Sequence, residues 1–139
     1  MSQDPDSRPE ERPFIVGIGA SAGGLEALSL LLPNLPKNLG LCYVVVQHLS
    51  PTYRSMMSQL LGRETTMPVK DIEDGVAPQP NTVYITPPNR NLTLTGGLFR
   101  LVEPARESLP KPSVNRFFAS LAEEIGESTI GIILSGTGS

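Results

Sequence analysis

The chain has 139 residues, a length that suits a single domain with one hydrophobic core. Eleven Lys and Arg residues against 14 Asp and Glu residues leave a net charge of −3, which offers no basic field to a nucleic-acid backbone. No apolar run in the sequence is long enough to span a membrane, and the acidic N-terminus does not match a secretory signal. We therefore expect a cytoplasmic protein that neither binds nucleic acid nor inserts into a membrane.

The first half of the chain predicts buried strands that alternate with helices. Residues 1–12 are polar and are expected to form a disordered tail ahead of a domain over 13–139. A β-branched strand is predicted at 14–18, followed by a glycine-rich turn at 19–24 and an amphipathic helix that Pro33 stops.

A second strand and helix follow in the same pattern. The apolar run 41–46 predicts another buried strand, and Ser50 with Pro51 caps a helix that Gly62 closes. Cys42, the single cysteine, lies in this run and is expected to be a small buried thiol in a reducing compartment. One cysteine and one distant histidine form no metal cluster, and we expect no cofactor.

The second half adds an antiparallel unit before it returns to the same pattern. A strand is predicted at 82–86, and Gly96-Gly97 links two short strands as a hairpin. Ser113 caps a helix over 114–125, and a third buried strand at 129–134 leads into a glycine-rich end. We expect an α/β fold with a mainly parallel sheet in an α/β/α sandwich, extended by antiparallel hairpins over 82–101.

The turn at 19–23 reads G-A-S-A-G and matches the nucleophile pattern G-x-S-x-G. Glycines on both sides of Ser21 allow a sharp turn that raises its hydroxyl above the sheet. The alternative is a serine that only caps the following helix. A dinucleotide-binding loop is disfavoured, because the second strand ends in Gln47-His48 and not in an acidic residue.

His48 is the only histidine, and it follows the second predicted strand. Because parallel strands end at the same edge of a sheet, His48 and Ser21 are expected to meet there as base and nucleophile. The order of residues excludes the α/β-hydrolases, whose histidine comes late in the chain. Asp71, Glu73 and Asp74 are expected to be solvated in a turn.

Five motifs in this order resemble the catalytic domain of the CheB chemotaxis methylesterases. They occupy residues 18–24, 46–49, 84–88, 112–115 and 134–138. The resemblance implies a protein-glutamate methylesterase that acts on methyl-accepting chemotaxis receptors. Such an enzyme hydrolyses glutamate γ-methyl esters to glutamate and methanol, and some members also deamidate glutamine.

The resemblance also implies roles for individual residues. The family's serine corresponds to Ser21 and its histidine to His48. The N–H of Ala22, where many members carry threonine, is expected to stabilise the oxyanion, and Thr137 is a candidate for a second donor. Arg90, in the turn of 87–91, is a candidate for contact with an acidic receptor surface, with a solubilising role as the alternative.

The sequence departs from the family pattern at its two ends. The family's aspartate would come directly after Ser139, so we expect a domain that is incomplete at its C-terminus. The 139-residue chain should then hydrolyse its substrate slowly or not at all, unless Asp71 or Asp74 supplies the acid. The open edge of the 129–134 strand should favour self-association or low stability. We also expect no receiver domain ahead of the domain, as in family members that are fused to a receptor methyltransferase. The alternative functions are a receptor-binding module without catalysis and a general serine esterase.

Overall fold

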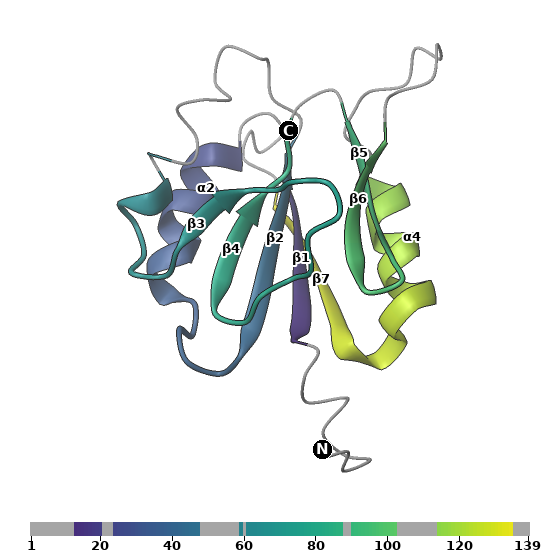
Figure 1. Ribbon diagram of the computed structural model, residues 1–139. Coiled ribbons are helices and arrows are strands. Elements are labelled where there is room, and N and C mark those ends of the chain that lie inside the picture. Colours follow the sequence, from purple (N-terminus) through teal and green to yellow (C-terminus); the bar gives the residue numbers. More distant parts are fainter. Residues whose placement is uncertain are drawn as a thin grey trace, which may run out of the picture.

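The computed structural model describes residues 13–20, 24–47, 59, 61–87, 90–102 and 114–134. Its central element is a parallel sheet with the strand order β3-β4-β2-β1-β7 (Figure 1). The strands are β1 (Phe14–Ala20), β2 (Leu41–Gln47), β3 (Val69–Asp71), β4 (Thr82–Ile85) and β7 (Thr129–Leu134). The prediction of a mainly parallel sheet is confirmed.

A separate two-stranded antiparallel sheet consists of β5 (Asn91–Thr95) and β6 (Leu98–Val102). Gly96 and Gly97 both have positive φ, the backbone geometry that their turn requires and that glycine adopts without strain. The prediction of an antiparallel hairpin is therefore confirmed at 91–102. It was wrong for Thr82–Ile85, which pairs in parallel with β2 inside the main sheet.

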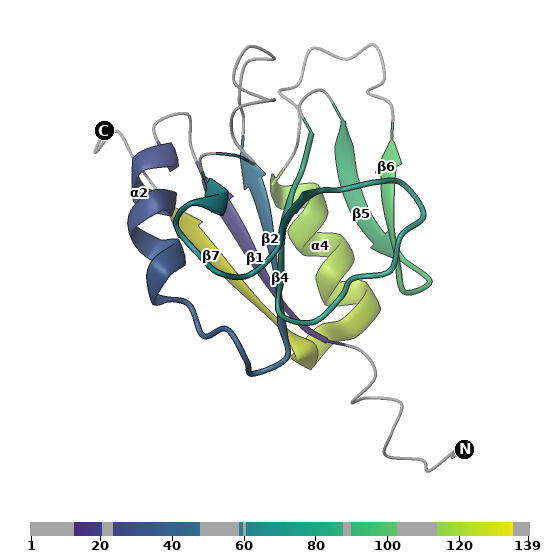
Figure 2. The ribbon, with the colours of Figure 1, turned by 60° about the vertical axis from the view of Figure 1, so that its left-hand side comes forward.

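Helices cover both faces of the main sheet, which gives three layers (Figure 2). Helix α2 (Gly24–Leu31) and the 3₁₀ turn η1 (Leu32–Asn34) pack on one face and contribute Leu28 and Leu32 to a first core. Helix α4 (Val114–Ile125), which leads into the 3₁₀ turn η3 (Gly126–Ser128), lies on the opposite face together with the β5–β6 hairpin. These elements enclose a second core around Phe99 and Phe117.

The boundaries of the predicted elements shift by a few residues. Strand β1 continues to Ala20 instead of ending at 18, because the parallel ladder with β2 and β7 carries two further residues of the expected turn. The α-helix ends at Leu31, and Pro33 lies inside the 3₁₀ turn that follows. Of the predicted second helix, positions 59, 61 and 62 are described and helical. The predicted tail 1–12 lies outside the described residues.

Strand β3 (Val69–Asp71) was not predicted, since the sequence indicates a turn at Asp71. The strand has three residues, and only Val69 is apolar, so it carries no periodic signal. Pairing with β4 holds it in place, with Val69 opposite Val83 and Asp71 opposite Ile85. This strand exists because of a tertiary contact that local pattern does not contain.

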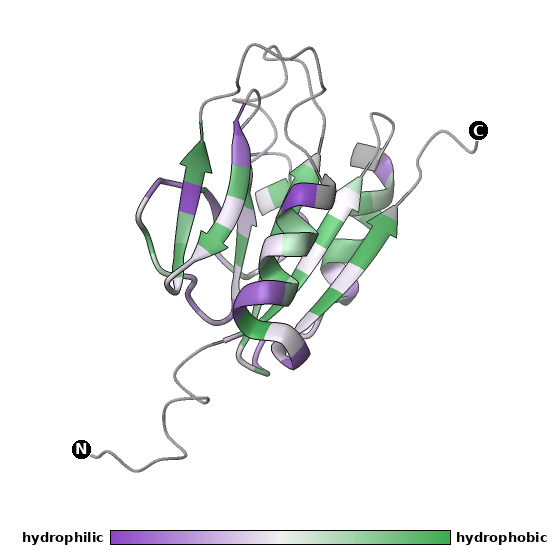
Figure 3. Ribbon diagram, turned by 90° about the vertical axis from the view of Figure 1, so that its right-hand side faces the viewer, coloured by the Kyte–Doolittle hydropathy of each residue, from purple (hydrophilic) through white to green (hydrophobic). Residues whose placement is uncertain are grey.

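Strand β7 was predicted as an apolar strand with an open edge, and it lies at an edge of the sheet, where its only strand partner among the described residues is β1. Ile130 is 50% exposed and Ile133 is 65% exposed. Figure 3 shows hydrophobic residues along most of this strand and alternating hydrophobic and hydrophilic bands on α4. The apolar run is typical of a strand buried on both faces, yet the described part of the chain covers it only in part.

Helix α4 approaches the centre of the sheet closely because two glycines face it. A Cβ added at Gly17 would lie 2.8 Å from Cε1 of Phe118, and one added at Gly131 would lie 3.0 Å from Cε2 of the same ring. Side chains at these two positions would push the helix away from β1 and β7. The glycines therefore determine the distance between α4 and the two strands.

Replacing Gly17 by alanine is expected to destabilise the fold by about 1–3 kcal/mol, the usual cost of overpacking a core. Gly62→Ala is the matched control, because it is helical and exposed and a Cβ there meets nothing within 4 Å. This control should raise the free energy of unfolding by up to about 1 kcal/mol, since alanine favours helix. Urea denaturation of both variants measures the difference, and equal stabilities would contradict the role given to Gly17.

Candidate active site

Three neighbouring strands of the sheet end at the same level. Ala20, the last residue of β1, pairs with Gln47 at the end of β2 and with Leu134 at the end of β7. Strand β1 therefore ends between two partners that stop beside it. The polar residues that follow each strand in the sequence all start from this one edge.

The end of β1 is also the point where the connections of the sheet reverse direction. From β1 the chain continues through α2 to β2 on one side, whereas α4 leads into β7 on the other side. Helices α2 and α4 lie on opposite faces of the sheet (Figure 2). In open α/β sheets this arrangement leaves a crevice beyond the carboxyl ends of the strands, and ligands bind there.

Four of the sequence-predicted site residues lie outside the described residues. Ser21 and Ala22 follow Ala20 in the chain, His48 follows Gln47, and Thr137 is three residues beyond Leu134. The structure thus places the strand ends that precede these residues in the chain. The roles of their side chains stay a prediction. Their strands are the three that end together at the reversal point.

Two described side chains belong to the same edge. Arg90 is half-buried in the connection between β4 and β5, and its role toward a receptor stays a prediction. Thr86, the residue after β4, is 4% exposed, and its Oγ1 has no hydrogen-bond partner among the described residues. The sequence predicts only a strand at Thr86, because an unpaired hydroxyl leaves no signal in sequence.

The two acids considered as internal candidates lie away from β1. Asp71 ends β3, which β4 and β2 separate from β1. An oxygen of Asp74 accepts a hydrogen bond from the Leu101 N–H at 2.9 Å, and its other oxygen lies 4.0 Å from Arg100. Asp74 is therefore engaged with the β5–β6 hairpin. Across the described part of the chain, no group of three His, Cys, Asp or Glu side chains could hold a metal ion.

Cys42 is fully buried in the second core, as its apolar surroundings predicted. Burial raises the pKa of its thiol to about 12. Because the thiolate is the reactive form of cysteine, a thiol with this pKa is inert near neutral pH. Cys42 therefore fills the core and is no nucleophile.

The native chain should react very slowly with a thiol reagent such as DTNB. A pKa of about 12 in place of 9.0 lowers the thiolate fraction at pH 8 by about a thousandfold, and burial blocks access as well. Absorbance of the released thionitrobenzoate measures the rate. Unfolding in guanidinium should expose one thiol per chain at once, because Cys42 is the only cysteine. Rapid labelling of the native chain would contradict this prediction.

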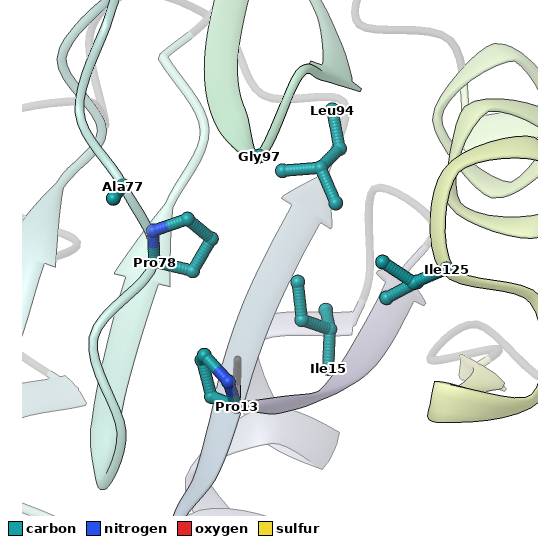
Figure 4. Close-up of a pocket in the computed structure, with 7 residues that line it drawn as sticks. All are labelled: Pro13, Ile15, Ala77, Pro78, Leu94, Gly97 and Ile125. Atoms are coloured by element: carbon teal, nitrogen blue, oxygen red, sulfur yellow. The ribbon is translucent and has the colours of Figure 1, made fainter. Parts of the chain in front are cut away.

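A small apolar cavity of about 120 Å³ lies near the start of β1, away from the strand ends (Figure 4). Its lining comes from β1, the 77–78 segment, the hairpin and the end of α4. The lining residues are Pro13, Ile15, Ala77, Pro78, Leu94, Gly97 and Ile125. None of these side chains can donate or accept a proton, so this cavity is not a site for ester hydrolysis.

Comparisons with known proteins agree with this geometry. The sequence profile of the CheB methylesterase family matches residues 16–139, so the chain belongs to this family. The crystal structure of the Thermotoga maritima CheB methylesterase catalytic domain is similar, with a TM-score of 0.78 and 34% identity. The match covers 91% of this chain and 69% of that one. None of the helices in the described part of the chain is long and apolar enough to cross a membrane.

Curated relatives are similar over nearly the whole chain. The protein-glutamate methylesterase/protein-glutamine glutaminase 3 of Pseudomonas savastanoi pv. phaseolicola is 35% identical over 136 residues, which are 96% of this chain and 40% of that protein. The protein-glutamate methylesterase/protein-glutamine glutaminase 2 of Cupriavidus metallidurans is 37% identical over 128 residues, which are 91% of this chain and 38% of that protein. The chain thus spans about 40% of the length of these relatives.

Proposed function

We propose that this protein is a protein-glutamate methylesterase that hydrolyses glutamate γ-methyl esters on methyl-accepting chemotaxis receptors. Membership in the CheB methylesterase family supports the ester substrate. The printed names of the relatives also include glutaminase, so the proposal extends to deamidation of receptor glutamine. We further propose a domain over 13–139, a cytoplasmic location, and a receptor methyltransferase as a fused or separate partner.

The proposed reaction proceeds through an acyl-enzyme. The Ser21 hydroxyl attacks the ester carbonyl while His48 takes its proton, and the N–H of Ala22, with Thr137 as second donor, stabilises the oxyanion. As the tetrahedral intermediate collapses, His48 returns the proton to the methoxy oxygen, which leaves as methanol, and the acyl-enzyme remains. Water, deprotonated by His48, then releases the glutamate and restores Ser21.

One observation supports this mechanism most directly. Ala20 pairs with both Gln47 and Leu134, so these three residues lie at one level of the sheet. Ser21, His48 and the 135–139 segment directly follow them in the sequence. That level lies at the reversal point where α/β proteins bind ligands. Serine, histidine and a glycine-rich segment at such an edge are the groups that ester hydrolysis requires.

The test measures methanol released from a methylated chemoreceptor, with the chain in molar excess so that slow hydrolysis is detected. Methanol release above the spontaneous rate is expected, together with ammonia from receptor glutamines. Receptor binding without methanol release, also from a chain extended through the family's aspartate, would favour the non-catalytic module. Hydrolysis of small esters with no release from the receptor would favour a general esterase.

A further inference from the structure

The apolar cavity near the start of β1 lies at the opposite end of the sheet from the candidate active site. It has a volume of about 120 Å³ and is partly open to solvent. Figure 4 shows Ile15 of β1, Leu94 of β5 and Ile125 of α4 around it. Ile15 is the second residue of β1, whereas the candidate site begins after the last one, Ala20. The cavity is therefore separate from the groups proposed for catalysis.

The wall of this cavity offers little to a polar ligand. The N–H of Leu94 donates to Oγ of Ser120 at 3.1 Å, and the N–H of Gly97 donates to Oε2 of Glu124 at 2.7 Å. The two prolines in the lining have no N–H. A bound water needs two to four polar partners, so the cavity suits an apolar group. An apolar cavity of about 150 Å³ in another protein binds benzene, so a slightly smaller one fits a leucine-sized side chain.

Three glutamates surround the cavity's end of α4. Glu123 and Glu124 lie in the last turn of the helix and Glu127 in η3, so they flank Ile125 in the chain. The last turn contains no basic residue, and none of the three carboxylates has an ion pair with another described residue. The carboxyl end of a helix carries a partial negative charge, which disfavours carboxylates there and favours cations. The hydrogen bond from Gly97, which lines the cavity, holds the Glu124 carboxylate beside it.

We propose that this cavity is a docking site for a basic polypeptide segment of a partner protein, which inserts one leucine-sized aliphatic side chain and places Lys or Arg beside the three glutamates. The apolar lining selects the inserted side chain, and charge complementarity selects the residues that flank it. The site does not depend on the proposed function. A segment bound here leaves the carboxyl edge of the sheet accessible to a substrate.

The test uses the synthetic peptide Lys-Lys-Leu-Lys-Lys with blocked ends, titrated into the 139-residue chain labelled with ¹³C at Ile and Leu methyl groups. Binding should shift the methyl signals of Ile15, Leu94 and Ile125, which line the cavity. A peptide with alanine in place of leucine should bind at least about tenfold more weakly, because less apolar surface is buried. A peptide with glutamate in place of every lysine should not bind measurably, and added salt should weaken the binding of the basic peptide.

Filling the cavity tests its place in the complex. Ala77 lines the cavity and is exposed, so Ala77→Leu adds a side chain there without overpacking a core. It should weaken binding of the leucine peptide at least about tenfold, since the space for the inserted side chain is lost. Ala119→Leu is the matched control, because Ala119 is exposed on α4 outside the lining. It should bind the peptide as the wild-type chain does.

Removing the charges tests the acidic rim and covers the case in which Ala77→Leu does not fold. Glu123→Gln combined with Glu127→Gln removes two exposed carboxylates and retains Glu124, which holds the hairpin. This double variant should bind the basic peptide several-fold more weakly and with less dependence on salt. Glu26→Gln combined with Glu64→Gln removes the same charge elsewhere in the described chain and should have a smaller effect.

Four outcomes would overturn the proposal. The leucine peptide could fail to shift the cavity signals, or the alanine peptide could bind equally well, which would indicate charge attraction alone. Shifts caused by benzene and not by the peptide would assign the cavity to a small apolar molecule. Shifts that grow with the concentration of the chain alone would assign it to a second copy. None of these measurements needs turnover, so they are independent of a failure to release methanol.

Discussion

Replacement of Ser21 by alanine is expected to lower methanol release from methylated receptor by at least about 10³-fold, or to the spontaneous rate if that is reached first. The variant lacks the oxygen that forms the acyl-enzyme, so only binding and oxyanion stabilisation remain, which support a small residual rate. His48→Ala should reduce the rate by a similar factor. The double variant should be no slower than either single one, because nucleophile and base act as a unit.

Ser128→Ala is the matched control for this experiment. Ser128 is exposed at the end of η3, just before β7 begins, and so lies at the opposite end of the strand from the 135–139 segment. It undergoes the same chemical change and should retain the full rate. Ser21→Ala with the wild-type rate would show that the nucleophile assignment is wrong, and the serine at this turn would then only cap helix α2.

Truncation of Leu121 to alanine is expected to lower the free energy of unfolding by about 3–5 kcal/mol. Leu121 is 1% exposed in α4 and belongs to the second core, so the change removes buried apolar surface and leaves a cavity. A domain of this size is stable by only about 5–15 kcal/mol in total. The variant should therefore be only marginally folded.

Leu30→Ala makes the same truncation in the other helix, at a side chain that is 69% exposed. It should change the stability by less than about 0.5 kcal/mol, because little buried surface is lost. Guanidinium denaturation followed by circular dichroism measures both variants. Equal effects at the two positions would mean that α4 does not pack on the sheet as the second core requires.

The close packing of α4 also bears on the candidate site. Phe117 and Leu121 anchor the helix on the second-core face, the same face on which the register places Val46 and Thr86. Loss of this packing would loosen the support of the strand ends before it unfolded the sheet. Leu121→Ala at temperatures where it remains folded should therefore reduce turnover more than Leu30→Ala.

The sequence by itself determined the elements that carry strong periodicity. Strands β1 and β2 are mostly apolar runs that include β-branched residues, because both of their faces are buried. Helix α4 repeats its apolar residues at helical spacing because one side faces the core. The motif around Ser21 and the single histidine could also be recognised from the sequence, because their chemistry depends on residue type and on a position after a strand. These features are local, so a single sequence contains them.

The tertiary structure alone decided which strands are neighbours and where each one ends. Strand β3 forms only by pairing with β4, and β7 lies beside β1 because α4 crosses the face opposite to α2. That crossing creates the reversal point at Ala20, where three strands stop together, and it leaves Ile133 at an edge. The buried position of the Thr86 hydroxyl, which has no partner among the described residues, likewise follows from the register of β4 with β2. Neighbours and register arise from contacts between residues far apart in the chain, and no local pattern encodes them.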